Sequence, residues 1–157
     1  MHILAHQYDL IKERRETLFR YCETISPGHF TFKHDAFGGG SIQHLLVHIA
    51  NTYTFWLGHF TTIAAEPFAK PDMALHEIRL LYKSVDSIAE NFLSRFDPTL
   101  EEPITNKISG RDMEVAITPL QLFTHVITHE YHHKGQILSM SRQLGYTPID
   151  TDIIRFE

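Results

Sequence analysis

Apolar residues recur every three or four positions over four long stretches of the chain. The first stretch spans residues 2–24 and contains Ile3, Leu4, Tyr8, Ile11, Leu18, Tyr21 and Cys22. This spacing places side chains on one face of an α-helix, so the stretch predicts an amphipathic helix. The segment SPGHF at 26–30 interrupts the pattern, because proline and glycine favour turns.

The second stretch follows a glycine-rich turn, FGGGS at 37–41, in which Ser41 is suited to cap a helix. Residues 41–66 then carry one broad apolar face, formed by Ile42, Leu45, Leu46, Ile49, Tyr53, Trp56, Leu57 and Phe60. Pro67 and Pro71 end this helix. A third helix is predicted from Pro71 or Asp72 to about Arg95, since proline and acidic residues are favoured in a first turn.

The period changes between residues 97 and 118. The segment ITNKISGRDMEVAI has a Ser-Gly pair at 109–110 between two short alternating runs, which predicts a small hairpin or an extended loop. Thr118 and Pro119 are an N-cap and a first helical residue, and a fourth helix is predicted from there to about Leu144. Gly145 is suited to end it, and the apolar tail that follows is expected to pack against the body.

Four long helices in 157 residues predict an all-α fold. We expect a single domain over residues 1–157, a four-helix bundle with a small hairpin or extended loop before the last helix. Bundles of this kind hold metal ions and ligands between side chains on facing helices. The bundle therefore directs attention to polar residues on the inner faces.

Composition and charge exclude several classes of function. A formal net charge of −5 disfavours nucleic acid as a partner. Basic and acidic residues are interleaved in the first helix, in the run Lys12, Glu13, Arg14, Arg15, Glu16 and Arg20. This run predicts a solvated helix face. Cys22 is the only cysteine, so no intrachain disulfide forms. Without a signal peptide or an apolar run near about 18 residues, a cytoplasmic protein with no membrane partner is expected.

The candidate chemistry lies in the histidines, of which the chain has twelve. His125, His129 and His133 are four apart on the fourth helix and form one stripe. Neighbours in the stripe can bind one ion, but the outer two lie about 12 Å apart along the axis. The second helix offers a matching pair, His44 and His48. Two such pairs favour a shared metal site over a set of ordinary capping, surface or core histidines.

The segment HEYHH at 129–133 also matches the H-E-x-x-H pattern of metalloproteases, in which the glutamate is a general base. Their third ligand lies downstream, but the sequence continues KGQILSMSRQLG with no H-x-x-G-x-x-H extension. The chain also has no evident strand to bind an extended peptide. A protease is therefore disfavoured, and Glu130 remains a candidate base for which a surface position is the expected outcome.

Two segments resemble the DinB family, also described as DinB/YfiT-like metal-dependent hydrolases. They are SIQHLLVHIANTYTFWL at 41–57 and LFTHVITHEYHHKGQILSMSRQLGYTPIDTDII at 122–154. The most specific parts are the H-x-x-x-H-[KR]-G-Q segment and the L-G-x-x-P-x-x-x-D tail. The resemblance implies a four-helix bundle, a homodimer, and three histidines that bind one divalent ion per chain, often zinc or nickel.

Residue by residue, the resemblance places the ligands at His48, His129 and His133. Three other residues are candidates for lining the pocket or orienting a ligand, namely His44, His125 and Tyr53, and for Tyr53 packing in the core or at an interface is the expected role. His132 points about 100° away from His133 and is not a ligand. Asp152 matches the acidic position of the tail, where docking or capping is expected. Gly135 is unfavourable within a helix, which suggests the close approach of a neighbouring helix.

Three imidazoles leave coordination positions open, as in catalytic rather than structural sites. Relatives include thiol S-transferases that use bacillithiol and a mycothiol-dependent isomerase. The resemblance thus implies a metal-dependent enzyme, a thiol S-transferase or hydrolase, with a small-molecule substrate and a low-molecular-weight thiol in a detoxification or stress context. The alternatives are a non-catalytic metal-binding stress protein and an interaction module with structural histidines. Substrate specificity is expected in the loops at 26–40 and 97–117.

Overall fold

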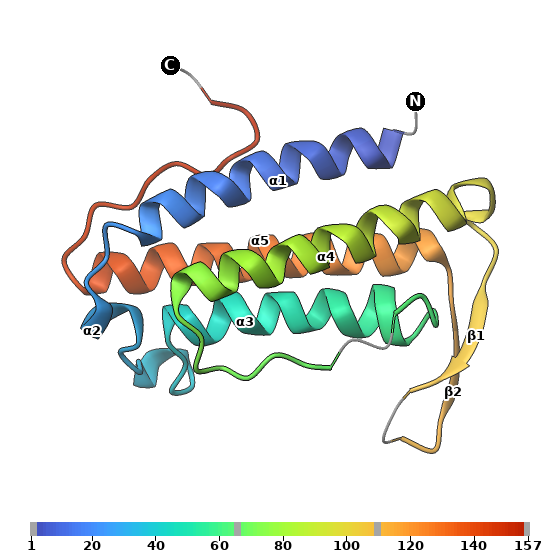
Figure 1. Cartoon of the computed structure of the whole chain (residues 1–157), viewed down its shortest axis with the longest axis horizontal. Helices are drawn as coiled ribbons and strands as arrows, with labels where there is room; N and C mark the ends of the chain where they lie inside the picture. The colour runs from blue at the N-terminus through green and yellow to red at the C-terminus, as the bar shows by residue number, and fades with distance from the viewer. Residues whose placement is uncertain (1–2, 65–66, 109–110, 156–157) are drawn as a thin grey trace.

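The computed structural model describes residues 3–64, 67–108 and 111–155. The chain is mostly helical and has a small two-stranded sheet. Its long helices lie lengthwise beside one another (Figure 1): α1 (Ile3–Cys22), α3 (Ile42–Tyr53), α4 (Leu75–Phe96) and α5 (Pro119–Gln143). Helix α3 contacts both α4 and α5, and α1 contacts α4. The apolar core lies among these helices and includes Tyr8, Leu18, Leu46, Ile49, Ile78, Phe92, Phe123 and Ile137.

The connection from α1 to α3 contains short helical turns. The one-turn helix α2 (Pro27–Phe30) is capped by Ser26, whose side chain accepts from the backbone N–H of His29. A 3₁₀ turn, η1 (Asp35–Phe37), follows. The predicted break after the first helix is confirmed, although the segment at 26–30 itself forms a turn of helix. Gly38 and Gly39 adopt positive φ angles of 64° and 75°, which the glycine-rich turn requires.

The second predicted helix begins where expected and ends early. Ser41 caps α3 by accepting from the backbone N–H of His44. The helix continues as a π-helical segment, η2 (Thr54–His59), in which the backbone N–H of Phe60 donates to the carbonyl of Phe55 at 2.8 Å. The chain then turns at Thr62, which has φ of 60°. The prediction of a helix up to residue 66 was wrong beyond this turn, and residues 65–66 lie outside the described ranges.

Helix α4 begins later than the sequence suggested. The predicted start at Pro71 or Asp72 was wrong, since the first helical residue is Leu75. Glu77 explains the difference, because its carboxylate accepts from the backbone N–H of Ala74 at 2.7 Å. That bond satisfies a free donor at the true N-terminus, as in a capping box.

The predicted hairpin is present next to the last helix. Strands β1 (Ile104–Lys107) and β2 (Glu114–Ile117) pair antiparallel, with Ile104 opposite Ile117. The predicted turn at 109–110 lies outside the described residues. Asn106 donates from Nδ2 to the carbonyl of Phe60 at 2.8 Å, which holds the hairpin against the end of η2.

The last helix and the tail agree with the sequence. Thr118 caps α5 by accepting from the backbone N–H of Gln121, and Gly145 follows the helix with φ of 93°. In the tail, the hydroxyl of Tyr146 accepts from the backbone N–H of Ser26, and Thr151 is buried. Gly135 differs from expectation: a Cβ there would meet nothing within 4 Å, so no helix approaches it closely.

None of the helices in the described ranges combines the length and the apolar character needed to cross a membrane.

Candidate metal centre

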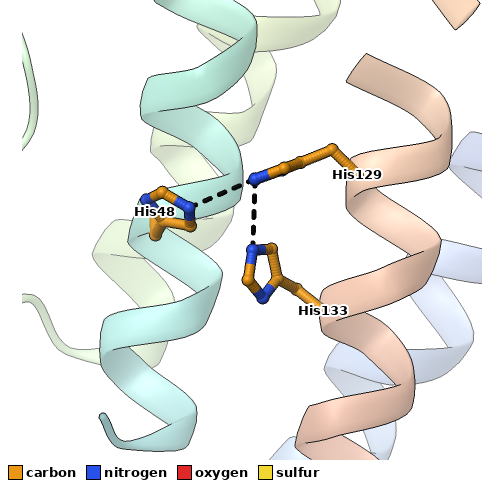
Figure 2. Close-up of side chains that lie close together, drawn as sticks. All are labelled: His48, His129 and His133. Atoms are coloured by element: carbon orange, nitrogen blue, oxygen red, sulfur yellow. Dashed lines mark hydrogen bonds between the residues drawn. The ribbon is translucent and has the colours of Figure 1, made fainter. Parts of the chain in front are cut away.

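The three predicted ligands meet in the seam between α3 and α5. The two helices run in opposite directions, and His48 on α3 faces His129 and His133 on α5 (Figure 1, Figure 2). One ligand nitrogen from each residue lies within 4.8 Å of the other two. The i, i+4 spacing on α5 places two of these rings on one face of the helix.

The distances within this triad fit a bound ion better than hydrogen bonds alone. The Nε2 atom of His129 lies 3.2 Å from Nε2 of His48 and 3.1 Å from Nε2 of His133. An imidazole nitrogen has one in-plane site, either a proton or a lone pair, so His129 cannot make a proper hydrogen bond to both partners. Three nitrogens bound tetrahedrally at 2.0–2.1 Å from zinc would lie about 3.3 Å apart. The two distances to His129 are close to this value, and all three ligand nitrogens lie within 4.8 Å of one another.

A neighbouring side chain sets the tautomer of one ring. The Nδ1 atom of His133 lies 2.6 Å from the amide oxygen Oε1 of Gln136. An amide oxygen only accepts, so Nδ1 of His133 carries the proton and Nε2 presents its lone pair to the triad. Metal-binding histidines commonly have such a partner on the other ring nitrogen.

Burial and mutual repulsion keep the triad neutral. Burial is the main cause that lowers the pKa of His129 to about 4, and His133 and His48 contribute by repelling a positive charge there. Burial also lowers the pKa of His48 and of His133, and the Gln136 contact opposes the change at His133. The neutral imidazole is the form that binds metal ions, so these shifts prepare the ligands near neutral pH.

The remaining histidines of the two helices lie around the triad. His44, His125 and His132 are exposed. The ring of His125 is centred 5.8 Å from that of His129 and 5.4 Å from that of Trp56. The ring of His132 is centred 4.9 Å from that of His133, but His132 does not belong to the group of converging ligand atoms.

Glu130 has a different environment from the one expected. The surface position was wrong, because Glu130 is 1% exposed. Its Oε1 accepts from Arg15 Nε at 3.0 Å and lies 3.3 Å from Lys134 Nζ. Its Oε2 accepts from Arg15 Nη2 at 2.8 Å and from the Tyr53 hydroxyl at 2.7 Å. Three hydrogen bonds and the ion pair with Lys134 thus surround both oxygens of the carboxylate.

The charges of this network make Glu130 a weak base. Burial alone would raise its pKa, but Arg15 and Lys134 outweigh burial and lower the pKa of Glu130 to about 2. A general base works best with a pKa near the operating pH. The geometry and the charge therefore both favour a structural role, as the counterion of two buried cations.

Arg15 also departs from the sequence prediction of a solvated face. It is 3% exposed, and its Nη1 donates to Asp86 Oδ1 at 2.6 Å. The sequence held a signal for this, because Arg15 lies four residues after Ile11 and three before Leu18, on the apolar stripe of α1. The charged residues on either side of Arg15 in the sequence made this position on the apolar stripe hard to recognise.

Tyr53 belongs to the same network. Its side chain is 0% exposed, and its hydroxyl contacts Glu130 rather than an open pocket. The network of Arg15, Glu130, Tyr53 and Asp86 therefore ties α1, α3, α4 and α5 together behind the ligand residues.

Asp152 is exposed in the tail, where its backbone N–H donates to Asp150 Oδ1 at 2.8 Å.

Comparison with protein families gives one result. A model of the DinB family matches residues 1–157, the whole chain. A comparison with curated proteins finds no match.

Proposed function

Because this chain belongs to the DinB family, we propose that it binds one divalent metal ion through His48, His129 and His133 and uses it in catalysis. The observation that carries the proposal is the convergence of the three Nε2 atoms, at 3.1 and 3.2 Å from neighbour to neighbour. Zinc or nickel is the expected ion, since imidazole ligands suit both. We also infer that the four long helices form a four-helix bundle of the family type, supported by the contacts between α3 and its neighbours.

The reaction favoured by the surroundings is transfer of a low-molecular-weight thiol to a small electrophile. A bound divalent ion lowers the pKa of a coordinated thiol far enough to deprotonate it. It lowers the pKa of a coordinated water molecule to about 7, so that deprotonation of the water is incomplete near neutral pH. Hydrolysis is helped by a general base, and the nearest glutamate in sequence, Glu130, is saturated by its own partners. Three neutral ligands leave the charge of the ion uncompensated, which favours an anionic thiolate there. We therefore place S-transferase ahead of hydrolase.

The first experiment measures metal content. Purified protein should contain or take up about one zinc or nickel ion per chain, and His48→Ala should abolish this. His132→Ala is the matched control, because His132 lies beside His133 but outside the converging group. Circular dichroism of both variants separates the loss of a ligand from the loss of the fold.

The second experiment tests turnover. The metal-loaded protein should conjugate an aromatic chloride such as chlorodinitrobenzene with an added thiol, and His48→Ala should not. A bound metal without activity across a set of thiols and esters would support the non-catalytic metal-binding alternative. The absence of bound metal in the folded protein would contradict both.

We propose in addition that the protein is a homodimer. An apolar groove of about 400 Å³ runs between α1, α5 and the tail, and its lining includes Leu10, Ile127 and Ile153. Ile154 beside it is 73% exposed. Exposed apolar surface of this kind is typical of an interface. Light scattering should give a mass near twice the 18.2 kDa of the chain, and a monomer at micromolar concentration would contradict the proposal.

A further inference from the structure

A second pocket lies next to the metal centre, at the end of the seam that faces the hairpin. Its volume is about 250 Å³, and its lining residues are Trp56, Ala116, Ile117, Gln121, Leu122 and His125. They come from η2, from β2 and from the first turns of α5. We call it the Trp56 pocket.

The Trp56 pocket lies beside the triad, and the side chain of His125 is close to both. Trp56 follows His48 by eight residues, across the end of α3 and into η2, and His125 precedes His129 by four on α5. Each side of the seam therefore carries a ligand residue and then, nearer the hairpin, a pocket residue. These are His48 and Trp56 on one side and His129 and His125 on the other. The His125 ring spans the boundary, centred 5.4 Å from the ring of Trp56 and 5.8 Å from the ring of His129. A molecule bound at the triad reaches this pocket by extending past the His125 ring.

The position of Trp56 is held by packing. Its ring contacts Phe55 at 4.8 Å and Phe60 at 5.7 Å between centroids. The π-helical turn contributes to this arrangement, and such turns are frequent at functional sites. The hairpin forms the opposite wall through Ile117, and the Asn106 bond to Phe60 fixes that wall relative to Trp56.

The chemistry of the lining selects a class of ligand. In the described part of the chain, no Asp, Glu, Lys or Arg lines the Trp56 pocket; its lining combines the rings of Trp56 and His125 with three aliphatic side chains and the uncharged amide of Gln121. A volume of about 250 Å³ is below the range of roughly 300–1,000 Å³ for whole ligands. It fits a part of a molecule, and aromatic groups pack well against a tryptophan ring.

We propose that the substrate of the metal centre carries a flat, uncharged aromatic group and that this group binds in the Trp56 pocket. This inference rests on the proposed function, because it requires a reacting group held at the triad. It assigns Trp56 and the hairpin to substrate selection, and it gives the loop at 97–117 a direct part in specificity.

The test uses two probes that differ by a phenyl group. Zinc-loaded protein is titrated with benzohydroxamate and with acetohydroxamate, both of which bind zinc through the same atoms. Benzohydroxamate should bind at least about tenfold more tightly, by burial of its ring. Trp56 is the only tryptophan, so its fluorescence should change with benzohydroxamate and much less with acetohydroxamate.

Two variants test whether the preference for benzohydroxamate over acetohydroxamate arises in the Trp56 pocket. Trp56→Ala, measured by calorimetry, should reduce the tenfold preference to about twofold and leave zinc content and acetohydroxamate affinity unchanged. Ala116→Phe should do the same by filling the pocket from an exposed strand position, which keeps the test valid if Trp56→Ala folds poorly. The matched control is Phe32→Ala, which removes an aromatic ring that is 49% exposed and does not line the pocket.

The outcomes separate the inference from the function on which it rests. Equal affinity for the two hydroxamates in zinc-loaded protein would overturn the Trp56 pocket proposal and leave the metal centre intact. A preference for benzohydroxamate that survives in both Trp56→Ala and Ala116→Phe would also overturn it. Folded protein that retains no zinc would refute the proposed function and this inference together.

Discussion

Replacing Glu130 by glutamine tests whether the carboxylate behind the triad is structural or catalytic. Glu130→Gln keeps the shape of the side chain and removes its charge. Arg15 and Lys134, both nearly fully buried, then lose a counterion. The amide also presents one N–H₂ group where the carboxylate accepted hydrogen bonds from Arg15 and Tyr53 and paired with Lys134. Each carboxylate oxygen accepts from Arg15, so in either orientation of the amide one Arg15 contact becomes donor against donor.

The expected loss of stability is large. Removing one partner of a buried ion pair costs about 3–5 kcal/mol, because a buried charge remains uncompensated. Asp86 still contacts Arg15 at 2.6 Å, which holds the cost near the lower end of that range. A loss of about 3 kcal/mol is a substantial fraction of the roughly 5–15 kcal/mol that stabilises a typical domain.

The assay is urea unfolding of metal-free protein at pH 7, so that metal binding does not contribute. Glu90→Gln is the matched control, since Glu90 pairs with Lys12 at 2.8 Å on the exposed surface. Its removal should cost less than about 1 kcal/mol. A loss in Glu130→Gln no larger than in Glu90→Gln would refute the structural role. Unchanged stability together with lost turnover would instead identify Glu130 as a base.

Three further predictions follow from single contacts. Acidification should destabilise the metal-free protein between pH 4.5 and about 2, because the pKa of Glu130 in the folded protein is below its ordinary value. The contribution of Glu130 to the free energy of unfolding is complete above pH 4.5 and is lost as the carboxylate is protonated. Calorimetry should show this loss in the native chain and much less of it in Glu130→Gln. Gln136→Leu should weaken zinc binding about 10–100-fold in a chelator competition, because His133 loses the acceptor that sets its tautomer. Gly145→Ala should lower the free energy of unfolding by more than about 1 kcal/mol because of its positive φ, whereas Gly135→Ala, in open space on α5, should raise it by about 1 kcal/mol. Effects of the same sign at both glycines would contradict this.

The elements that sequence predicted well depend on local signals. Ser41, Thr118 and Gly145 mark helix ends through bonds or angles within a few residues, and the structure confirms each of them. The hairpin is equally local. The start of α4 was misplaced because Pro71 is a favourable first residue, while the decisive bond is made by the side chain of Glu77.

The elements that sequence missed depend on distant partners. Glu130 and Lys134 are four apart and resemble an exposed helical ion pair, but Arg15, their neighbour in space, is 115 residues from Glu130. Periodicity can place Arg15 on an apolar stripe, but it cannot identify Glu130 as the counterion of Arg15. For the triad, the spacing alone left several combinations of histidines open. The family resemblance selected His48, His129 and His133, and the structure brings these three together.

The most direct test of the metal centre is anomalous diffraction at the zinc edge from crystals of the zinc-loaded protein. We predict a single strong peak in the seam between α3 and α5, about 2.0–2.1 Å from the Nε2 atoms of His48, His129 and His133. A peak on His44, His125 or His132 instead, or no peak among these residues at full zinc loading, would contradict the account.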